Sequence, residues 1–486
     1  MTQPLRIAIV HYHLRAGGVT RVIEQASTAL IASGCEVAVF AGEVPADFSL
    51  SPEVRLQILP GLNYSSEYSE EMVARLETDL DAACIKAFGR MPDVWHFHNH
   101  SLGKNLNLPH IVKYWSEKGR AMVLQIHDFA ENGRPENYQR LLQIAAQGDT
   151  TRLAEILYPV APGIHYAVLN PRDLEILRAA GAGESVSILS NPVEWDESRV
   201  HSRGLLKERF TLYPCRPIRR KNIGEALLWT FFFEEGERLV IPVAPHLEAD
   251  RKAYALWCEC AAQLRLPVEF EAIPRLAPNL ETLVASAHRI LTTSIMEGFG
   301  MTFLEPFLAG KPLIGRNLPE ITENFSSDGI GLQHLYTSLP IPVEWVGHKR
   351  LQQSFKSAIL RLKKAYGIKI PESSIEKTES LFINSDTVDF GHLSEDIQRE
   401  VLMLICVNPE MKKQILTSLL AVPSTPQLSR DAIREYYSAS RYAKNAIRLY
   451  KEILSATGTA SGYLNAQSIL ETNVSQSLPL LLRITG

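Results

Sequence analysis

The sequence lacks the features that mark several classes of protein. Its 486 residues carry a formal net charge of −4. The chain therefore lacks the excess of positive charge that would indicate binding to nucleic acid or to an anionic membrane surface. The longest apolar candidate, residues 226–233, is too short to span a bilayer. The first residues lead directly into a predicted strand, without the layout of a secretory signal peptide. We therefore expect a cytoplasmic protein without a nucleic-acid partner and without membrane association.

Cysteine is also sparse. The six cysteines are scattered along the chain, and no C-x-x-C pair occurs. Cys258 and Cys260 fall in a helical pattern, where residues two positions apart do not share a face. The distribution indicates reduced and mostly buried thiols.

What the sequence does contain is typical of a globular enzyme. Hydrophobic residues make up 45% and charged residues 21%, and the length exceeds what one hydrophobic core supports. In the first half, buried β-type runs alternate with helical patterns at 20–32 and 70–87. The predicted strands are 7–12, 37–40, 54–59, 94–98, 123–126, 166–169 and 186–189. This alternation predicts a parallel, doubly wound α/β sheet.

The alternation breaks at 194–209, a charged segment that we interpret as an interdomain linker, and then resumes. Predicted strands follow at 212–215, 239–243, 268–270 and 290–295, and predicted helices at 222–233, 250–264 and 280–287. After about residue 339 the chain contains amphipathic helical patterns at 354–366, 394–405 and 431–454. The sequence therefore predicts two Rossmann-like domains, residues 1–200 and 201–345, followed by a helical extension over 346–486.

The most informative stretch runs from Glu297 to Glu305. A β-rich run at 289–295 precedes a Gly-Phe-Gly turn, and a helix-compatible run at 301–309 follows it. Such a turn leaves backbone N–H groups free for an anion and places two carboxylates nearby, which suits the phosphates and hydroxyls of a nucleotide sugar. Both glutamates also match a capping box, with Ser294 and Thr302 three positions earlier. The two glutamates together, with the glycines between them, favour the binding interpretation.

This pattern resembles the E-x7-E signature of retaining glycosyltransferases of family 4, which have the GT-B fold of two facing Rossmann-like domains. The resemblance implies that Glu305 binds the nucleotide ribose and that Glu297 binds the donor hexose. It extends the donor site over Gly298, Phe299, Gly300, Met301 and Thr302. It also implies that a helix within 430–454 returns to the first domain. One departure is Pro306, which would disturb the first turn of a helix capped by Thr302.

Two further turns follow predicted strand ends, where doubly wound sheets bind their ligands. Gly17 and Gly18 follow the first strand, and family 4 enzymes have a similar turn near the donor phosphate. Arg216 and Lys221 follow the first strand of the second half and resemble the family's Arg…Lys-Asn element. Together these two cations would stabilise the diphosphate leaving group. The alternative for the glycine pair is a tight turn without a ligand, and the alternative for the basic run is a solvated basic turn.

Histidines occur at two other strand ends. A family histidine similar to His127 contacts the donor hexose near the reacting centre, and Asp128 would fix its tautomer or form a cap. His96, His98 and His100 alternate, which predicts three side chains on one strand face. That spacing can bind zinc, but no carboxylate in register completes the set, so we expect cleft or core histidines instead.

The resemblance as a whole implies a retaining hexosyltransferase that moves a hexose from a nucleotide sugar to a soluble small-molecule or carbohydrate acceptor. We expect His127, Glu297, Arg216 and Lys221 to carry the catalysis, with neither a cofactor nor a bound metal required. A nucleotide-sugar epimerase on the same scaffold and a non-catalytic nucleotide-binding protein are the alternatives.

Overall fold

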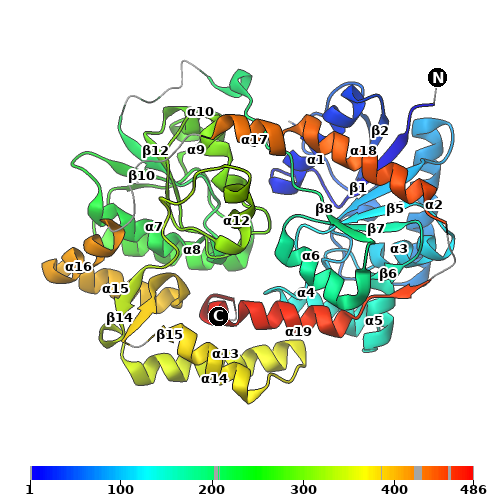
Figure 1. Cartoon of the computed structure of the whole chain (residues 1–486). Coiled ribbons are helices and arrows are strands. Elements are labelled where there is room, and N and C mark those ends of the chain that lie inside the picture. The colour runs from blue at the N-terminus through cyan, green and yellow to red at the C-terminus, as the bar shows by residue number, and fades with distance from the viewer. Residues whose placement is uncertain are drawn as a thin grey trace. The chain divides into compact units, whose positions relative to one another are not determined.

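The computed structural model describes residues 3–46, 48–201, 206, 208–384, 386–420, 429–457 and 461–484. The chain divides into two compact units (Figure 1). Unit 1 comprises Met1–Val193 and Glu435–Gln476, and unit 2 comprises Glu194–Arg434 and Ser477–Gly486. The chain therefore enters unit 1 a second time and ends in unit 2.

Unit 1 is built on a seven-stranded sheet in the order β3-β2-β1-β4-β5-β7-β8, in which all neighbouring strands are parallel. The strands are β1 (Arg6–His11), β2 (Glu36–Ala41), β3 (Arg55–Ile58), β4 (Val94–His98), β5 (Met122–Gln125), β7 (Ile164–Val168) and β8 (Val186–Ile188). Each predicted strand of the first half overlaps one of these. The central strands β4, β5 and β7 are buried throughout, as expected for a parallel sheet that is covered on both faces.

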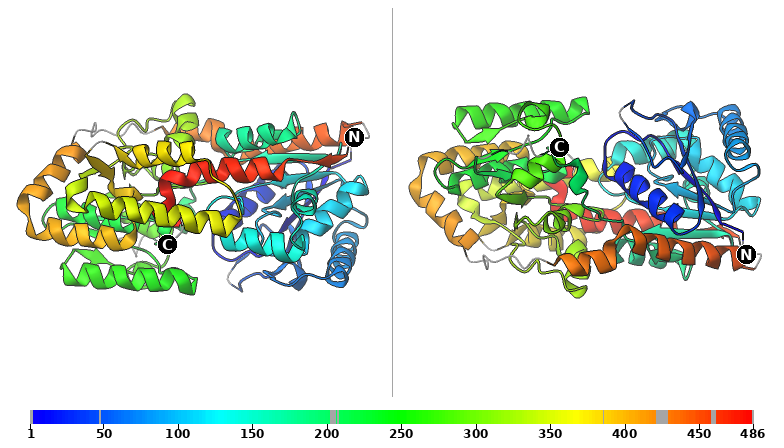
Figure 2. Two further views of the ribbon diagram at one scale, coloured as in Figure 1. Left: turned by 90° about the horizontal axis from the view of Figure 1, so that it is seen from below. Right: turned by 90° about the horizontal axis from the view of Figure 1, so that it is seen from above.

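Helices cover both faces of this sheet (Figures 1 and 2). They are α1 (Gly18–Ala32), α2 (Glu70–Phe88), α3 (Leu108–Glu117), α4 (Pro135–Arg140), α5 (Thr150–Leu157), α6 (Pro171–Leu177), α18 (Ala439–Ser455) and α19 (Ala466–Ser477). A short antiparallel pair joins β6 (Pro159–Val160) to β17 (Gly462–Tyr463).

Helix α18, orange in Figure 1, lies beside α1 and completes the core of unit 1. Ala443 and Ala446 of α18 belong to the same hydrophobic cluster as Ile23 and Leu30 of α1, and all four side chains are buried. The prediction of a single helix over 431–454 was wrong in one respect. It is divided into α17 (Arg430–Tyr437) and α18, because Ser438 leaves the helical conformation and caps α18 through the Arg441 amide.

Unit 2 contains a second parallel sheet, in the order β11-β10-β9-β12-β13. Its strands are β9 (Phe210–Leu212), β10 (Arg238–Val240), β11 (Val268–Glu269), β12 (Arg289–Thr292) and β13 (Leu313–Gly315). The helices that follow them are α7 (Ile223–Trp229), α8 (Glu248–Gln263), α9 (Ala272–Arg275), α10 (Leu280–Ser286) and α12 (Pro319–Ser327). The predicted elements of the second half overlap these strands and helices.

A smaller subdomain joins this sheet within unit 2; two of its helices overlap the predicted helices 354–366 and 394–405, but its antiparallel strands were not predicted. Three antiparallel strands, β14 (Pro340–Pro342), β16 (Thr387–Asp389) and β15 (Ile383–Asn384), are accompanied by α13 (His348–Tyr366), α14 (Glu372–Phe382), α15 (Glu395–Val407) and α16 (Pro409–Leu420). Arg316, after β13, ties the two parts together. Its buried guanidinium lies 2.6 Å from Glu225 and 2.7 Å from Asp389. This buried ion network links α7 to β16, whose Val388 side chain is also buried.

The described helices include none long and apolar enough to cross a membrane. All six cysteines are free, and four of them are buried.

Candidate functional site

The Gly-Phe-Gly turn follows β12 and has a fixed conformation. Gly300 adopts a left-handed φ of 87°, and a Cβ added there would lie 2.7 Å from Cδ2 of Phe303. Only glycine meets both conditions. Phe299 is buried, and its ring packs edge-on against Phe325 at a centroid distance of 5.5 Å. Packing and backbone geometry therefore hold the turn on the body of unit 2.

The prediction of a continuous helix over 301–309 was wrong. The chain forms a 3₁₀ turn, Met301–Phe303, and then the four-residue helix α11 (Glu305–Leu308). Pro306 stands in the first turn of α11, where its missing N–H costs no helical hydrogen bond. The proline thus begins a new helix instead of disturbing an existing one. Because α11 is so short, its dipole adds little to anion binding.

The basic turn after β9 meets this turn at Glu297, whose carboxylate is almost fully buried. Lys221 Nζ forms an ion pair with Oε1, and Arg220 Nη1 lies 2.9 Å from Oε2. Burial alone would raise the pKa of the Glu297 carboxyl, but the charges of Lys221 and Arg220 outweigh it and lower the pKa to about 2. Glu297 is therefore ionised at neutral pH, and the three side chains together carry one net positive charge.

Side-chain donors hold the backbone of the basic turn from several elements. Tyr213 Oη donates to the Lys221 carbonyl at 2.5 Å, and Thr293 Oγ1 donates to the same carbonyl at 3.0 Å. The Ile295 amide donates to the Arg220 carbonyl at 2.9 Å. These contacts fix where the Arg220 and Lys221 side chains begin.

The other predicted donor residues lie on the same two turns. Cys215, next to Arg216, approaches Thr302 with an Sγ–Oγ1 distance of 3.9 Å. Arg216 is half-buried, and this burial lowers its pKa. Glu305 is half-buried at the start of α11. The structure thus places the two sequence motifs of unit 2 against each other.

The direct contact between Arg220 and Glu297 was not predicted from the sequence. The signal was present, because Arg219, Arg220 and Lys221 are three consecutive basic residues. They form a 3₁₀ turn in which successive side chains point in different directions, so spacing alone did not show which of them face the carboxylate.

In unit 1, the glycine turn after β1 has the predicted position. Gly17 is extended and immediately precedes α1, and Gly18 is the first residue of that 15-residue helix. A Cβ added to Gly18 would meet no atom within 4 Å, so the turn leaves room for a ligand to approach the backbone.

His127 is buried and lies beside a second histidine. Its Nε2 is 2.8 Å from His98 Nδ1, and its backbone amide donates to Asn99 Oδ1 at 2.7 Å. Burial lowers the pKa of His127 to about 4, so the imidazole is neutral at physiological pH. Asp128 forms an ion pair with Arg134 at 2.8 Å. The sequence indicated Asp128 as a partner that orients His127, whereas the structure adds His98 in direct contact.

His96 is oriented from α18. Its Nε2 donates to Gln125 Oε1 at 3.0 Å, and its Nδ1 accepts from the Tyr450 hydroxyl at 2.7 Å. The rings of His96 and His98 stack at 4.7 Å, as expected for one strand face. The expectation that His100 shares this face was wrong. Strand β4 ends at His98, Asn99 turns into the left-handed region, and His100 contacts the Leu157 carbonyl instead.

Three cations gather where α4 packs on the loop after β4. Asn137 Nδ2 donates to the Leu102 carbonyl at 2.9 Å, and Arg140 Nη2 donates to Asn137 Oδ1 at 2.7 Å. Lys104 follows on the same loop, with Nζ 5.4 Å from the centre of the Tyr64 ring. Burial lowers the pKa of Lys104, and the charges of Arg140 and Arg134 lower it further. We call Lys104, Arg134 and Arg140 the cationic cluster.

The cationic cluster is incompletely neutralised. Arg134 pairs with Asp128, but no carboxylate pairs with Lys104 or Arg140 in the part of the chain that the structure describes. Arg140 Nε is buried and has no hydrogen-bond partner among the described residues. Buried donors of this kind bind anions readily, because their desolvation has already occurred on folding.

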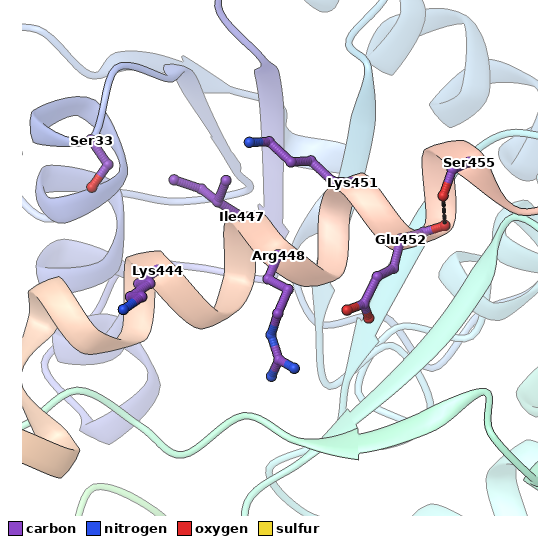
Figure 3. A pocket seen from close by; sticks show the side chains of 7 residues that line it. All are labelled: Ser33, Lys444, Ile447, Arg448, Lys451, Glu452 and Ser455. Atoms are coloured by element: carbon purple, nitrogen blue, oxygen red, sulfur yellow. Dashed lines mark hydrogen bonds between the residues drawn. The ribbon is translucent and has the colours of Figure 1, made fainter.

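A surface hollow of about 590 Å³ lies elsewhere, between the end of α1 and α18 (Figure 3). It is lined by Ser33, Lys444, Ile447, Arg448, Lys451, Glu452 and Ser455. Figure 3 shows its charged side chains spread along one helix without converging on a point. The end of α1 lies at the amino-terminal edge of the sheet, opposite the edge where such folds bind their ligands. No predicted site residue lines this hollow.

No family model matches the chain. It is 24% identical to mannosylglucosyl-3-phosphoglycerate synthase of Petrotoga mobilis over 497 residues, covering 93% of this chain and 92% of that protein. Sucrose-phosphate synthase from Thermosynechococcus elongatus has a similar structure, with a TM-score of 0.52, 15% identity, and coverage of 93% of this chain and 100% of the other. The catalytic domain of starch synthase IV from Arabidopsis thaliana, bound to ADP and acarbose, gives a TM-score of 0.50, 12% identity, and coverage of 93% and 100%. These similarities confirm the predicted GT-B fold.

Proposed function

We propose that this chain, a GT-B glycosyltransferase with distant homology to mannosylglucosyl-3-phosphoglycerate synthase, is a retaining hexosyltransferase that uses a nucleotide-sugar donor and a small anionic acceptor. The observation that carries the proposal is the buried group formed by Arg220, Lys221 and Glu297. It joins the basic turn and the signature turn in one site.

The charges of this group suit a diphosphate. Arg220 and Lys221 contribute two positive charges and Glu297 one negative charge, and Arg216 adds a further cation on the same loop. In the proposal, Lys221 and Arg216 bind the diphosphate oxygens and stabilise the charge that develops as the sugar–phosphate bond breaks. Because the turn is already held by Tyr213 and Thr293, little reorganisation accompanies binding.

The remaining donor contacts follow the signature. Glu297 and the amides of Phe299, Gly300 and Met301 bind the hexose hydroxyls, and Glu305 binds the ribose. In unit 1, Gly17 and Gly18 approach the phosphates. His127, which is neutral, exchanges a hydrogen bond with a hexose hydroxyl, while His98 sets its orientation. These roles are assigned by the resemblance of the motifs and supported by the burial and contacts of each side chain.

The proposed reaction keeps the anomeric configuration of the donor. The acceptor oxygen forms a bond to C1 of the hexose on the face that the diphosphate leaves. The bond from C1 to the phosphate oxygen breaks, and that oxygen receives the acceptor's proton. The products are the glycosylated acceptor and a nucleoside diphosphate. A buried, neutral His127 fits this scheme because no protein base is needed.

The cationic cluster supports an acceptor with phosphate or carboxylate groups. Lys104, Arg134 and Arg140 lie on segments that follow β4 and β5, at the edge of the sheet that carries His127. Two of the three cations have no carboxylate partner among the residues that the structure describes. The name of the Petrotoga relative contains phosphoglycerate, an anion of this class. A phosphate would receive charge-assisted hydrogen bonds from Lys104 and Arg140.

The donor is identified by incubating the protein with UDP-, GDP- and ADP-sugars, with and without 3-phosphoglycerate or a sugar phosphate, and following products by NMR. Release of nucleoside diphosphate together with a new glycosidic signal is expected. Epimerised sugar without transfer would favour the epimerase. Binding of nucleotide without any turnover would favour a non-catalytic role.

The acceptor site is tested with Lys104→Met and Arg140→Met. Each loses one charge-assisted hydrogen bond of roughly 1.5–3 kcal/mol, so the KM for an anionic acceptor should rise about 10- to 100-fold. The slow hydrolysis of the donor should stay constant. Lys118→Met is the matched control, because Lys118 is an exposed lysine of unit 1 that pairs with Glu77. An unchanged acceptor KM in both cluster variants would refute the anionic acceptor.

A further inference from the structure

Arg483, three residues from the end of the sequence, is one of the largest fully buried side chains in the protein. It belongs to the short helix α20 (Leu481–Ile484) in unit 2. Burying a guanidinium removes its hydration, which is costly unless specific contacts replace it. No direct ion pair of Arg483 with a carboxylate occurs among the described residues. Such a buried cation calls for an explanation beyond packing.

The contacts of Arg483 lead to the basic turn. Nη2 donates to the Arg219 carbonyl at 2.7 Å, and Nη1 donates to Gln398 Oε1 at 3.0 Å. The Arg219 carbonyl also accepts from the Asn222 amide at 3.0 Å, which is the hydrogen bond that closes the 3₁₀ turn. Arg483 thus donates to the same carbonyl that accepts the hydrogen bond closing this turn.

A second path reaches the same turn through side chains. Gln398 Nε2 donates to Asn222 Oδ1 at 2.9 Å, and Asn222 Nδ2 donates to Glu225 Oε2 at 2.8 Å. Asn222 itself has a left-handed φ of 58°, which costs free energy in a residue other than glycine. The contacts from Gln398 and Glu225 over-determine this conformation. The strained residue follows Lys221 directly.

We infer that Arg483 is a positioning residue for the donor site, which fixes the backbone of the basic turn from helix α20 so that Lys221 meets the donor diphosphate. This inference rests on the proposed function of Lys221. It assigns a role to the C-terminal segment beyond closing the hydrophobic core, because Arg483 touches the turn and not the donor.

Arg483→Met keeps most of the side-chain volume but removes both hydrogen bonds. Small errors in the position of a charged group cost transfer steps heavily, so kcat/KM for the donor should fall at least tenfold. Arg483→Lys, which can still donate to the Arg219 carbonyl, should recover part of that loss. The matched control is Leu482→Ala, a buried neighbour on the same helix whose hydrocarbon side chain cannot form a hydrogen bond with the turn. It should destabilise α20 without a selective loss of donor kcat/KM.

A second readout is independent of catalysis. Hydrogen exchange of the Lys221 and Asn222 amides, measured by mass spectrometry on the full-length protein, should be faster in Arg483→Met than in Leu482→Ala at matched thermal stability. Equal exchange rates in the two variants would overturn the role of Arg483. A wild-type protein that releases no nucleoside diphosphate from any donor would instead contradict the proposed function, and the exchange result would still decide whether Arg483 holds the turn.

Discussion

Glu297→Gln removes one charge from the centre of the proposed donor site and leaves the shape of the side chain almost unchanged. In the wild type, the carboxylate accepts from Lys221 and from Arg220 at 2.9 Å while it is 7% exposed. The glutamine resembles the protonated acid, so it loses the attraction to both cations. Lys221 and Arg220 then remain close together without their common partner.

The size of the effect follows from the pKa of this carboxyl, which falls from 4.5 to about 2 in the folded protein. One pKa unit corresponds to about 1.4 kcal/mol, so the ionised form stabilises the fold by roughly 3 kcal/mol. Because Glu297 is buried, solvent screening reduces this figure little. We therefore expect Glu297→Gln to lower the free energy of unfolding of unit 2 by about 3 kcal/mol at pH 7.

The effect depends on pH in a defined direction. The folded pKa lies below the unfolded value, so the stabilisation is fully present above about pH 5 and is lost as the pH falls toward 2. At pH 4 the wild type should have lost about 1 kcal/mol of it. The difference between wild type and Glu297→Gln should therefore shrink from roughly 3 to about 2 kcal/mol between pH 7 and pH 4.

Urea-dependent hydrogen exchange of the β12 amides measures the stability of unit 2 separately from that of unit 1. Glu320→Gln is the control, because Glu320 is exposed on α12, and it should change stability by less than about 0.5 kcal/mol. Two results would contradict a stabilising role for the Glu297 carboxylate. One is a free energy of unfolding of Glu297→Gln within about 1 kcal/mol of wild type at pH 7. The other is a difference in unfolding free energy that stays constant from pH 7 to pH 4.

Three further predictions concern other parts of the structure. Gly300→Ala should destabilise unit 2 by about 1–2 kcal/mol more than Gly347→Ala in urea unfolding; both glycines have a positive φ, but a Cβ meets an atom within 4 Å only at Gly300. Tyr450→Phe removes the donor to His96 Nδ1 and should cost unit 1 about 1–3 kcal/mol, measured by the same method. The pKa of His127 is about 4, so the transfer rate should show no inflection from this residue between pH 6 and 8, and imidazole NMR signals should confirm its neutral form.

Most of the fold was predictable from the pattern of apolar residues. Buried parallel strands such as β1 and β2 contain continuous apolar runs, and the helices between the strands repeat with helical period. The predicted class of enzyme, a glycosyltransferase, is confirmed as well. The antiparallel strands of the smaller subdomain were not predicted, because each has only two or three residues, too few to show a strand pattern.

The candidate site was predictable in its motifs but not in its contacts. Glu297 and Lys221 are far apart in the sequence, and only the resemblance to a known signature paired them. Arg220 escaped because neighbouring residues of a 3₁₀ turn diverge in direction. The contribution of Arg483 depends on a contact between residues 264 positions apart, which no local pattern contains. Long-range hydrogen bonds to backbone carbonyls leave no trace in composition or periodicity.

The most direct test of the account is the NMR analysis of a transfer reaction with wild type and Lys221→Met, using an α-linked nucleotide sugar and a phosphorylated acceptor. We predict that the wild type releases nucleoside diphosphate and forms a product with the α configuration. We also predict that Lys221→Met, correctly folded, loses at least a hundredfold in rate, about 2.7 kcal/mol of transition-state stabilisation. A β-configured product would contradict a retaining reaction, and full activity in folded Lys221→Met would contradict the role of Lys221 in the transfer.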